Sequence, residues 1–332
     1  MHRRRAWLTL LLLAVPALGC GGSYPQTTLA PRSDFSWAIQ DLFTAVFWWA
    51  VAVFVVVEGL LLYTVLRYRQ RPQAPPPPHR HGHTALEIAW TLAPAVILVF
   101  IAIPTTRTIF RTSARAAPGA LRVEVIGHQW WWEFRYPDLG IVTANELRLP
   151  VGRPVVLEMT SADVIHSFWV PALGGKRDLT GRRTTRLTFT ADSLGVYSGQ
   201  CAEFCGVSHA NMRVRALVDS GPGFDAWVAR QRGGVVAAAR GSLEERGLQV
   251  YRRSPCIACH TLAGASTGLV GPDLSHVGSR TTIASGLLRN TPENLARWIR
   301  DAPSVKPGAL MPPMPLSDDD LAAVVAFLRG LQ

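Results

Sequence analysis

The sequence predicts a multidomain protein: a two-helix transmembrane hairpin, then an all-β barrel, then a short all-α domain. Two apolar stretches, at about residues 42–66 and 86–109, are each long enough to cross a bilayer as a helix. From residue 121 the pattern changes to short alternating strands broken by glycine and proline, which is typical of an antiparallel sandwich or barrel. A helical pattern returns after residue 241, where polar N-caps predict helices at Ser242–Arg253, Pro292–Asp301 and Ser317–Gly330.

The N-terminal segment, residues 1–19, has the features of a secretory signal peptide. Three arginines, Arg3–Arg5, precede the apolar run Ala6–Leu18, and small residues follow. The next residue, Cys20, stands where a bacterial lipoprotein is cleaved and lipidated, although the residues before it depart from the usual pattern. We expect a lipoprotein-type signal; the alternatives are a simple signal or an uncleaved anchor.

The hairpin, residues 40–112, is expected to cross the bacterial inner membrane twice. A basic, proline-rich loop that contains Arg67, Arg69 and Arg71 separates its two helices. The positive-inside rule places this loop in the cytoplasm, and hence everything after residue 110 on the periplasmic or extracellular side. Glu58 lies within the first span, where ionisable groups usually face protein or water, so we expect it to contact a partner subunit.

The net charge of +11 is concentrated outside the globular parts. Residues 1–119 hold 11 arginines and four acidic residues, whereas residues 120–219 and 242–332 each carry a net charge of only +1. No globular part therefore has the basic face that a nucleic-acid-binding protein needs. The five cysteines occur singly at Cys20 and as two close pairs, which excludes a disulfide-stapled scaffold.

A short loop concentrates side chains that bind soft or borderline metals. Two thiols, an imidazole and a thioether favour copper over magnesium or calcium: Cys201, Cys205, His209 and Met212. The imidazole of His166, on a loop between predicted strands, and the carbonyl of Glu203 are further donors. Two coppers bridged by both thiolates would use all of these donors. The spacing alone also fits a single copper ion or a disulfide between the two cysteines.

A second cluster, Cys256-Ile-Ala-Cys-His260, has the C-x-x-C-H form of a covalent c-type haem site. Cys256 and Cys259 would form the thioether bonds, and His260 would bind the iron. Met311 or Met314 would supply the second axial ligand, and a Met/His pair raises the potential of the haem. The alternatives are a chance motif or a redox-active dithiol.

Several motifs resemble subunit II of cytochrome c oxidase. The resemblance is carried by Gly127–Phe134 (Gly-His-Gln-Trp-Trp-Trp-Glu-Phe), by Val164–Trp169 and by the whole loop 201–212. Glu87–Pro94 also matches the second membrane helix of that family. The resemblance covers about residues 40–220. It implies a cupredoxin-like barrel at residues 120–219 that carries a dinuclear copper centre.

The resemblance also implies roles for individual residues. The copper ligands would be His166, Cys201, Glu203 (through its carbonyl), Cys205, His209 and Met212. The side chain of Glu203 would reach a magnesium ion at the contact with subunit I. Trp130 matches the residue through which electrons enter the copper site, and Glu87 matches the entrance of a proton channel. The alternatives are an interfacial carboxylate for Glu87 and ordinary barrel core for Trp130–Trp132, which we favour for Trp131.

The C-terminal segment, residues 242–332, resembles the all-α class I cytochromes c. The Pro-Gly-x-x-Met-Pro context of that family favours Met311 over Met314 as the second haem ligand. Residues 220–241, rich in glycine, are expected to connect the copper and cytochrome domains.

Together the resemblances imply subunit II of a caa-type cytochrome c oxidase, in which the donor cytochrome is fused to its acceptor. Electrons from cytochrome c or a quinol–cytochrome c reductase would pass through haem c and the copper centre to the haem of subunit I. Oxygen would be reduced to water there, with proton translocation, and subunit I and other oxidase subunits would be the partners. The alternatives are a copper-containing nitric oxide reductase subunit and, in a different class, a copper-delivery protein.

Overall fold

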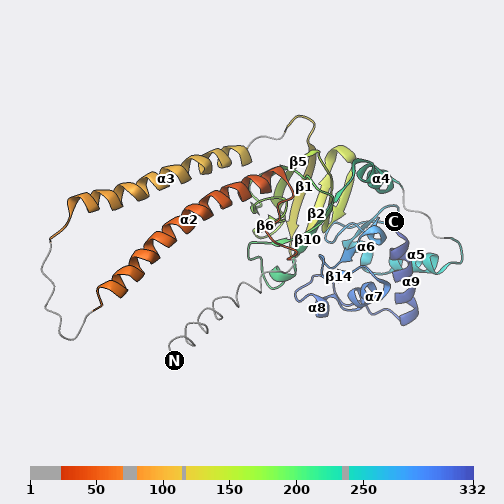
Figure 1. Ribbon diagram of the computed structural model, residues 1–332. Coiled ribbons are helices and arrows are strands. Elements are labelled where there is room, and N and C mark those ends of the chain that lie inside the picture. Colours follow the sequence, from red (N-terminus) through yellow and green to blue (C-terminus); the bar gives the residue numbers. More distant parts are fainter. Residues whose placement is uncertain (1–23, 70–80, 114–116, 234–238) are drawn as a thin grey trace, which may run out of the picture.

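The computed structural model describes residues 24–69, 81–113, 117–233 and 239–332. The signal peptide expected at residues 1–19 and the lipidation site Cys20 lie outside these ranges. Two long helices extend from one side of a globular part that is made of a β domain and a helical domain (Figure 1).

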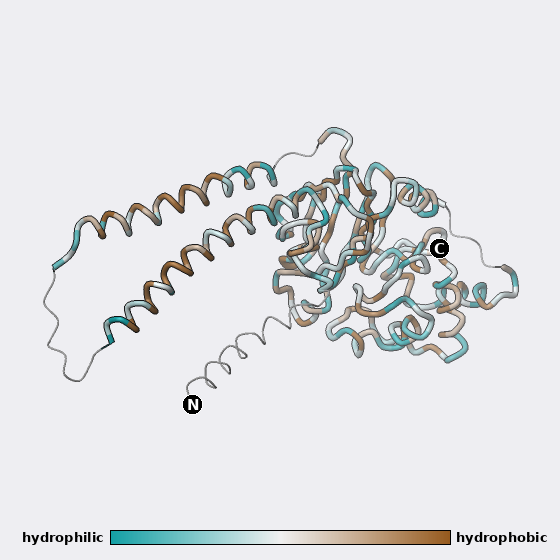
Figure 2. The backbone as a smooth tube through the Cα atoms, viewed as in Figure 1, coloured by the Kyte–Doolittle hydropathy of each residue, from teal (hydrophilic) through white to brown (hydrophobic). Residues whose placement is uncertain are grey.

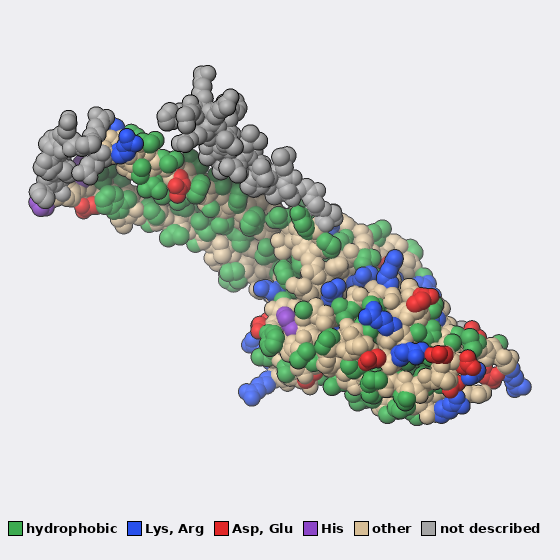
Figure 3. Space-filling model, turned by 90° about the horizontal axis from the view of Figure 1, so that it is seen from below, with side chains coloured by type: hydrophobic (Ala, Val, Ile, Leu, Met, Phe, Trp, Pro, Cys, Tyr) green, Lys and Arg blue, Asp and Glu red, His purple; other side chains and the backbone are tan. Residues whose placement is uncertain are grey.

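The two long helices are α2 (Asp34–Arg67) and α3 (Thr84–Thr112), and both are able to cross a membrane by length and composition. Their middle parts are hydrophobic (Figure 2) and their side chains are exposed. Trp49 and Phe100 stack between them with ring centroids 5.7 Å apart. Figure 3 shows hydrophobic side chains over the hairpin, whereas charged side chains gather over the globular part.

The first turn of α2 is built into the β domain. Ser33 caps the helix by accepting a hydrogen bond from the Ser36 amide, and its hydroxyl donates to the Leu173 carbonyl at 2.6 Å. The Asp34 carboxylate accepts a bond from the Thr190 amide at 2.7 Å. Phe35 is buried in the core of the β domain. The membrane helix and the β domain are therefore joined by packing as well as by the chain.

The β domain consists of two five-stranded sheets. In the first, the order is β3 (Ile141–Ala144), β2 (Trp131–Tyr136), β1 (Leu121–His128), β5 (Pro154–Ser161) and β8 (Thr185–Thr190). In the second, it is β4 (Glu146–Pro150), β10 (Arg213–Asp219), β9 (Gly195–Cys201), β6 (His166–Trp169) and β7 (Arg177–Leu179). The expected antiparallel arrangement is wrong for two neighbouring pairs, β1 with β5 and β10 with β4, which run parallel. In each pair other strands intervene along the chain.

Alternating side chains of β2 form the centre of the core between the sheets. Trp132, Phe134 and Tyr136 are fully buried, whereas Trp131 and Arg135 lie on the opposite face of the strand. The Tyr136 hydroxyl donates to the Arg148 carbonyl and accepts from its amide, both at 2.9 Å. Burying each large side chain contributes roughly 1.5–3 kcal/mol.

The segment expected to be a linker, residues 220–241, is folded in its first half. Helix α4 (Gly221–Arg232) begins at the N-cap Ser220. Phe224 and Trp227 lie three residues apart on one face of this helix, and both are buried against the β core. The helix therefore belongs to the β domain, and any connector is shorter than the sequence predicts.

The helical domain contains three long helices, α5 (Leu243–Arg253), α7 (Pro292–Arg300) and α9 (Asp318–Gly330). Each end lies within one residue of the helices that the sequence predicts at 242–253, 292–301 and 317–330. Short helices α6 (Cys256–Cys259) and α8 (Ala302–Val305) and the small hairpins β11–β12 (Thr261–Leu262, Ser266–Thr267) and β13–β14 (Thr282–Ile283, Leu288–Arg289) complete it. Helices α5 and α9 cross closely at Gly247, where a Cβ would lie 2.0 Å from the Ala323 carbonyl oxygen. The domain packs beside the β domain (Figure 1).

Candidate redox site

The loop after strand β9 and the start of strand β6 bring the predicted copper donors together. Strand β9 ends at Cys201, which lies opposite Phe168 in the pairing of β9 with β6. His166 is the first residue of β6, so the expectation that it lies on a loop is corrected. The Cys201 amide donates to the Met212 carbonyl at 2.9 Å, which closes the loop on itself.

Every predicted donor atom lies close to one of the two sulfurs. The Sγ atoms of Cys201 and Cys205 are 3.8 Å apart, too far for a disulfide bond. Near the first sulfur are His166 Nδ1 at 3.9 Å and the Glu203 carbonyl oxygen at 3.2 Å. Near the second are His209 Nδ1 at 3.6 Å and Met212 Sδ at 3.9 Å. A soft metal ion fits this donor set, because both thiols, both imidazoles and the thioether face one small region.

The two thiols are buried and they influence each other's ionisation. The hydrogen bond from the Cys205 thiol favours the Cys201 thiolate and so lowers the pKa of Cys201. The same bond, together with burial, raises the pKa of Cys205. A thiol with a lowered pKa is ready to act as a metal ligand, because metal ions bind the thiolate form.

His166 is held in one orientation by its neighbours. Its Nε2 atom lies 2.8 Å from the Asp163 carboxylate, so its Nδ1 atom faces Cys201. Gly127 lies against the ring: a Cβ there would be 2.8 Å from the imidazole Cδ2 carbon. Asp163 also accepts a bond from the Gln129 amide at 2.7 Å. Such carboxylate contacts fix the tautomer of metal-binding histidines.

The tip of the copper loop turns its side chains outward. The carbonyl of Glu203 faces Cys201, whereas its side chain is exposed. Phe204 and Val207 are 77 % and 75 % exposed, although both are apolar.

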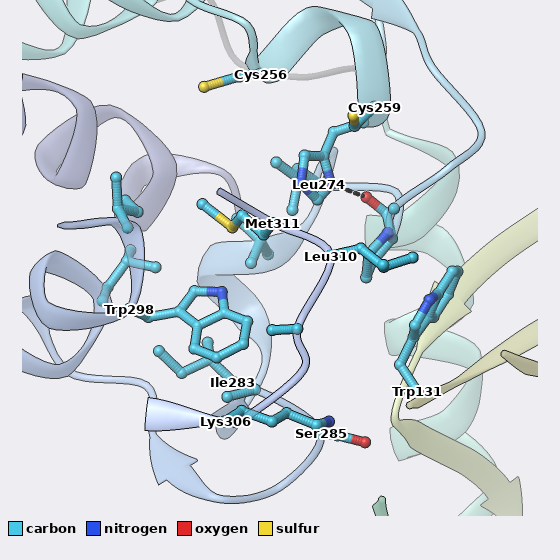
Figure 4. A pocket seen from close by; sticks show the side chains of 18 of the residues that line it. Trp131, Cys256, Cys259, Leu274, Ile283, Ser285, Trp298, Lys306, Leu310 and Met311 are labelled. Carbon is cyan, nitrogen blue, oxygen red and sulfur yellow. Dashed lines mark hydrogen bonds between the residues drawn. The ribbon is translucent and has the colours of Figure 1, made fainter. Parts of the chain in front are cut away.

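The predicted haem residues surround one largely apolar cavity in the helical domain (Figure 4). Cys256 and Cys259 lie at the two ends of α6, and Met311 extends into the cavity from the opposite side. The His260 Nδ1–H donates to the Pro272 carbonyl at 2.8 Å, which leaves Nε2 free for a metal ion. Burial lowers the pKa of His260 and so favours the neutral, ligating form. Met314 also lines the cavity.

A buried arginine makes this cavity suitable for an anionic cofactor. Arg280 lines it, and burial lowers the pKa of its guanidinium. Within the part of the chain that the structure describes, its Nε–H has no hydrogen-bond partner. A haem has two carboxylate groups that satisfy such a donor, so the cavity fits haem chemically as well as in its apolar lining.

Trp130 lies between the two centres. Its Nε1–H donates to the Cys205 carbonyl at 2.9 Å, and its ring lines the haem cavity. Trp131 also lines this cavity, half-buried, and stacks on His128 at 4.1 Å. The expectation that Trp131 is barrel core is therefore wrong, because the alternation of β2 places it on the outer face.

A buried lysine that the sequence did not indicate lies at the same place. Lys306, from the segment before Met311, donates to the Trp130 carbonyl and is 4 % exposed. Burial lowers its pKa to about 7, although the nearby Cys205 sulfur opposes that shift. Nothing in the local sequence distinguishes this lysine from a solvated one.

The fold and the site define a membrane-anchored electron-transfer protein with a metal-binding β domain and a c-type haem domain. Three family profiles match consecutive parts of the chain. "Cytochrome C oxidase subunit II, transmembrane domain" matches residues 31–107, "Cytochrome C oxidase subunit II, periplasmic domain" matches residues 140–218, and "Cytochrome c" matches residues 244–332.

Curated relatives match the chain over nearly its whole length. Cytochrome c oxidase subunit 2 of Alkalihalophilus pseudofirmus is 36 % identical over 98 % of this chain and 96 % of its own length. The Bacillus subtilis protein of the same name is 32 % identical over 98 % of both chains. The chain therefore belongs to the cytochrome c oxidase subunit II family, with a fused cytochrome c domain, and it binds copper and haem.

Among solved structures, the periplasmic domain of subunit II of the Bradyrhizobium japonicum cytochrome oxidase is 31 % identical. It matches 36 % of this chain and 96 % of that chain with a TM-score of 0.34.

Proposed function

We propose that this chain is the electron-entry subunit of a caa-type cytochrome c oxidase. When bound, its haem c and a dinuclear copper centre supply the two one-electron relays between an external reductant and the haem of subunit I. Oxygen reduction to water and proton translocation take place in that partner. The other roles belong to the residues of this chain, which bind the cofactors, orient them and keep water away from them.

The observation that carries this proposal is the position of Trp130. One edge of its indole is hydrogen-bonded to the carbonyl of Cys205, and the ring lines the haem cavity. No third protein is needed to connect the two sites. This arrangement supports Trp130 as the residue through which electrons enter the copper site.

The donors around the two sulfurs support a dinuclear centre. His166 and the Glu203 carbonyl lie beside Cys201, whereas His209 and Met212 lie beside Cys205. A single four-coordinate ion would leave buried donors unused. The exposed Glu203 side chain and the apolar Phe204 are directed away from the loop, where subunit I would bind and Glu203 would reach a magnesium ion.

In the haem site, Cys256 and Cys259 would hold the porphyrin covalently, with His260 and Met311 as axial ligands. Met311 is favoured over Met314 because its side chain extends into the cavity opposite α6 (Figure 4). Both axial ligands lie in a largely apolar surrounding that limits the access of water. A Met/His pair in such a site favours a high reduction potential, which suits a donor to copper.

The orientation of the hairpin supports a two-pass protein of the bacterial inner membrane with both redox domains on the periplasmic side. The N-terminal end of α2 and the C-terminal end of α3 point to the β domain (Figure 1). Glu87 lies in the first turn of α3, at the far end of the hairpin, and accepts a bond from the His83 amide at 3.2 Å. That position agrees with the entrance of a proton channel on the cytoplasmic side. Cytochrome c or a quinol–cytochrome c reductase would be the donor.

Metal analysis and electron paramagnetic resonance of the purified oxidase test this function. We expect two coppers and one covalent haem c assigned to this chain, with hyperfine splitting from one electron shared by two coppers. The variant Trp130→Phe should slow the transfer from haem c to copper while leaving both cofactors bound. Splitting from a single copper, or an unchanged transfer rate in this variant, would contradict the dinuclear centre or the role of Trp130, respectively.

A further inference from the structure

The cytochrome domain covers Trp130 in a closely fitted contact. The tryptophan side chain is 9 % exposed. Gly308 lies against it so closely that a Cβ at this position would be 2.8 Å from the indole Cη2 carbon. Beside the ring, the Ser208 hydroxyl of the copper loop donates to the Pro307 carbonyl at 2.5 Å. The surface of the cytochrome domain at this place is therefore complementary to the copper domain.

A carboxylate of the copper domain is buried within this contact. Glu146, the first residue of β4, is 4 % exposed, and among the described residues all the hydrogen-bond donors to its carboxylate come from the cytochrome domain. The amides of Thr281 and Thr282 donate to Oε1 at 2.9 and 2.8 Å. Their hydroxyls also donate to Oε1, at 2.5 and 3.0 Å. Removing a carboxylate from water is costly unless hydrogen bonds replace its solvation, and this contact provides those bonds.

The turn that supplies these donors has a backbone shape that fits the copper domain. Ala284 and Ser285 follow the two threonines in the β13–β14 hairpin, and both have positive φ angles, of 54° and 62°. This conformation allows the Ser285 hydroxyl to reach Asn145 Oδ1 and the Arg213 carbonyl, each at 3.1 Å. Non-glycine residues rarely adopt such angles unless surrounding contacts favour them.

A second anchor crosses the contact in the opposite direction. Lys306 of the cytochrome domain is 4 % exposed, and its amino group donates to the Trp130 carbonyl of the copper domain. The two anchors thus lie at different parts of the contact, one at β4 and one at Trp130. Two separated attachments restrain rotation as well as separation.

We infer that Glu146 and Lys306 are positioning residues that hold the tethered cytochrome in one docked orientation over Trp130, and that this docking reserves the copper centre for the tethered haem. The inference rests on the proposed transfer from haem to copper. A ring that the cytochrome domain covers offers no face to a soluble haem protein. An external carrier can then deliver electrons only to the tethered haem.

Rapid photoreduction of haem c in the intact oxidase tests the docking. In the wild type we expect electron transfer to copper in a single phase whose rate is independent of solvent viscosity. In Glu146→Ala the equilibrium constant for docking should fall about 10-fold or more, the effect of removing hydrogen bonds to a charged group. Transfer should then become slower and viscosity-dependent, while the potentials of both centres stay unchanged.

Matched variants separate docking from folding. Thr281→Val combined with Thr282→Val removes the two hydroxyl donors of the cytochrome domain, so it should slow transfer less than Glu146→Ala does. Added to Glu146→Ala, the two threonine substitutions should slow transfer little further. Lys306→Met removes the second anchor independently and should also make transfer slower and viscosity-dependent. Glu158→Gln changes a carboxylate of the same domain that pairs with Arg122 and Arg186, and should leave transfer unchanged.

The order of reduction by soluble reduced cytochrome c tests the second part of the inference. In the wild type, copper should be reduced only after haem c. In Glu146→Ala, part of the copper should be reduced directly, before haem c. Viscosity-independent transfer at the wild-type rate in both the Glu146 and Lys306 variants would overturn the inference. Absence of haem-to-copper transfer in the wild type would instead overturn the proposed function.

Discussion

The copper site and the haem cavity differ in how much of each the protein builds by itself. The copper donors already lie 3.2–3.9 Å from the two sulfurs, held by β6, β9 and the closed loop between Cys201 and Met212. The haem residues instead line a largely apolar cavity in the helical domain. A bound metal ion therefore completes an existing structure, whereas haem adds its own apolar surface to the core that α5, α7 and α9 share.

The largest expected effect follows from preventing haem attachment with Cys256→Ala combined with Cys259→Ala. Truncating a single large core side chain costs about 2–5 kcal/mol, and a haem fills far more space, so the helical domain should lose more than about 5 kcal/mol. That is comparable to the whole stability of a small domain. Hydrogen exchange should become fast in α5 and α9, while copper binding and the β domain persist. Slow exchange in both helices would show that the helical domain does not depend on haem for its stability.

Removing a copper ligand should have a smaller effect on folding. In Cys205→Ser we expect loss of copper but a folded β domain, less stable by about 2–4 kcal/mol because the stabilisation from bound metal is lost. Urea unfolding followed by tryptophan fluorescence measures this difference. Wild-type protein freed of copper by a chelator is the matched control and should unfold at the same urea concentration. Unfolding of the β domain without copper would show that its site is not preformed.

The contact between His166 and Asp163 refines the comparison, because it orients a ligand without binding metal. Asp163→Asn should weaken copper binding about 10- to 100-fold, as is usual for partners of metal-binding histidines. Competition with a chelator of known affinity measures this change. Asp178→Asn, at an exposed carboxylate on β7 of the same sheet, should leave the affinity unchanged. Equal effects of the two substitutions would indicate a general charge effect.

The smallest expected effect concerns Glu133, whose carboxylate is hydrogen-bonded to His128, the residue on which Trp131 stacks. Burial, the largest influence, raises the pKa of Glu133, but hydrogen bonds from His128 at 2.9 Å and Arg135 at 2.5 Å outweigh it and the net pKa is lowered. Ionised Glu133 therefore stabilises the fold above its ordinary pKa of 4.5, and this stabilisation disappears as the pH falls through the lowered value.

Glu133→Gln should accordingly cost about 1 kcal/mol at neutral pH and nothing in acid below the lowered pKa. Urea unfolding at several pH values measures this difference. A cost that stays constant across this range would show that the charge of Glu133 is not responsible.

Local patterns predicted most of the secondary structure, and the failures have physical causes. Helices α5, α7 and α9 were found because each has a polar N-cap and a periodic apolar face, which are local signals. Helix α4 was missed because Gly221, Pro222 and Gly223 resemble a loop, although proline is also favoured in the first turn of a helix. The parallel pairs were missed because they join strands that are far apart in the sequence.

The same limit applies to the candidate site. The copper loop and the haem motif are short and chemically unusual, so the sequence was sufficient to propose their ligands. Trp131 was assigned to the core, although the alternation in β2 would have placed it outside. Glu146 and Thr281 lie 135 residues apart, and neither has a local feature that indicates the other. Contacts between domains depend on shape and solvation that a one-dimensional pattern does not contain.

The attachment of α2 to the β domain fixes the direction in which the copper loop, residues 201–212, faces. With 34 residues, α2 is about 51 Å long, roughly 20 Å more than the hydrocarbon core of a bilayer. Ser33, Asp34 and Phe35 join the first turn of α2 to the β domain. The helix therefore sets the distance of that domain from the membrane and its rotation about the helix axis. Inserting one residue into α2 would turn the copper loop by about 100° around the helix axis. The phase of a membrane helix thus decides which way an exposed redox loop faces.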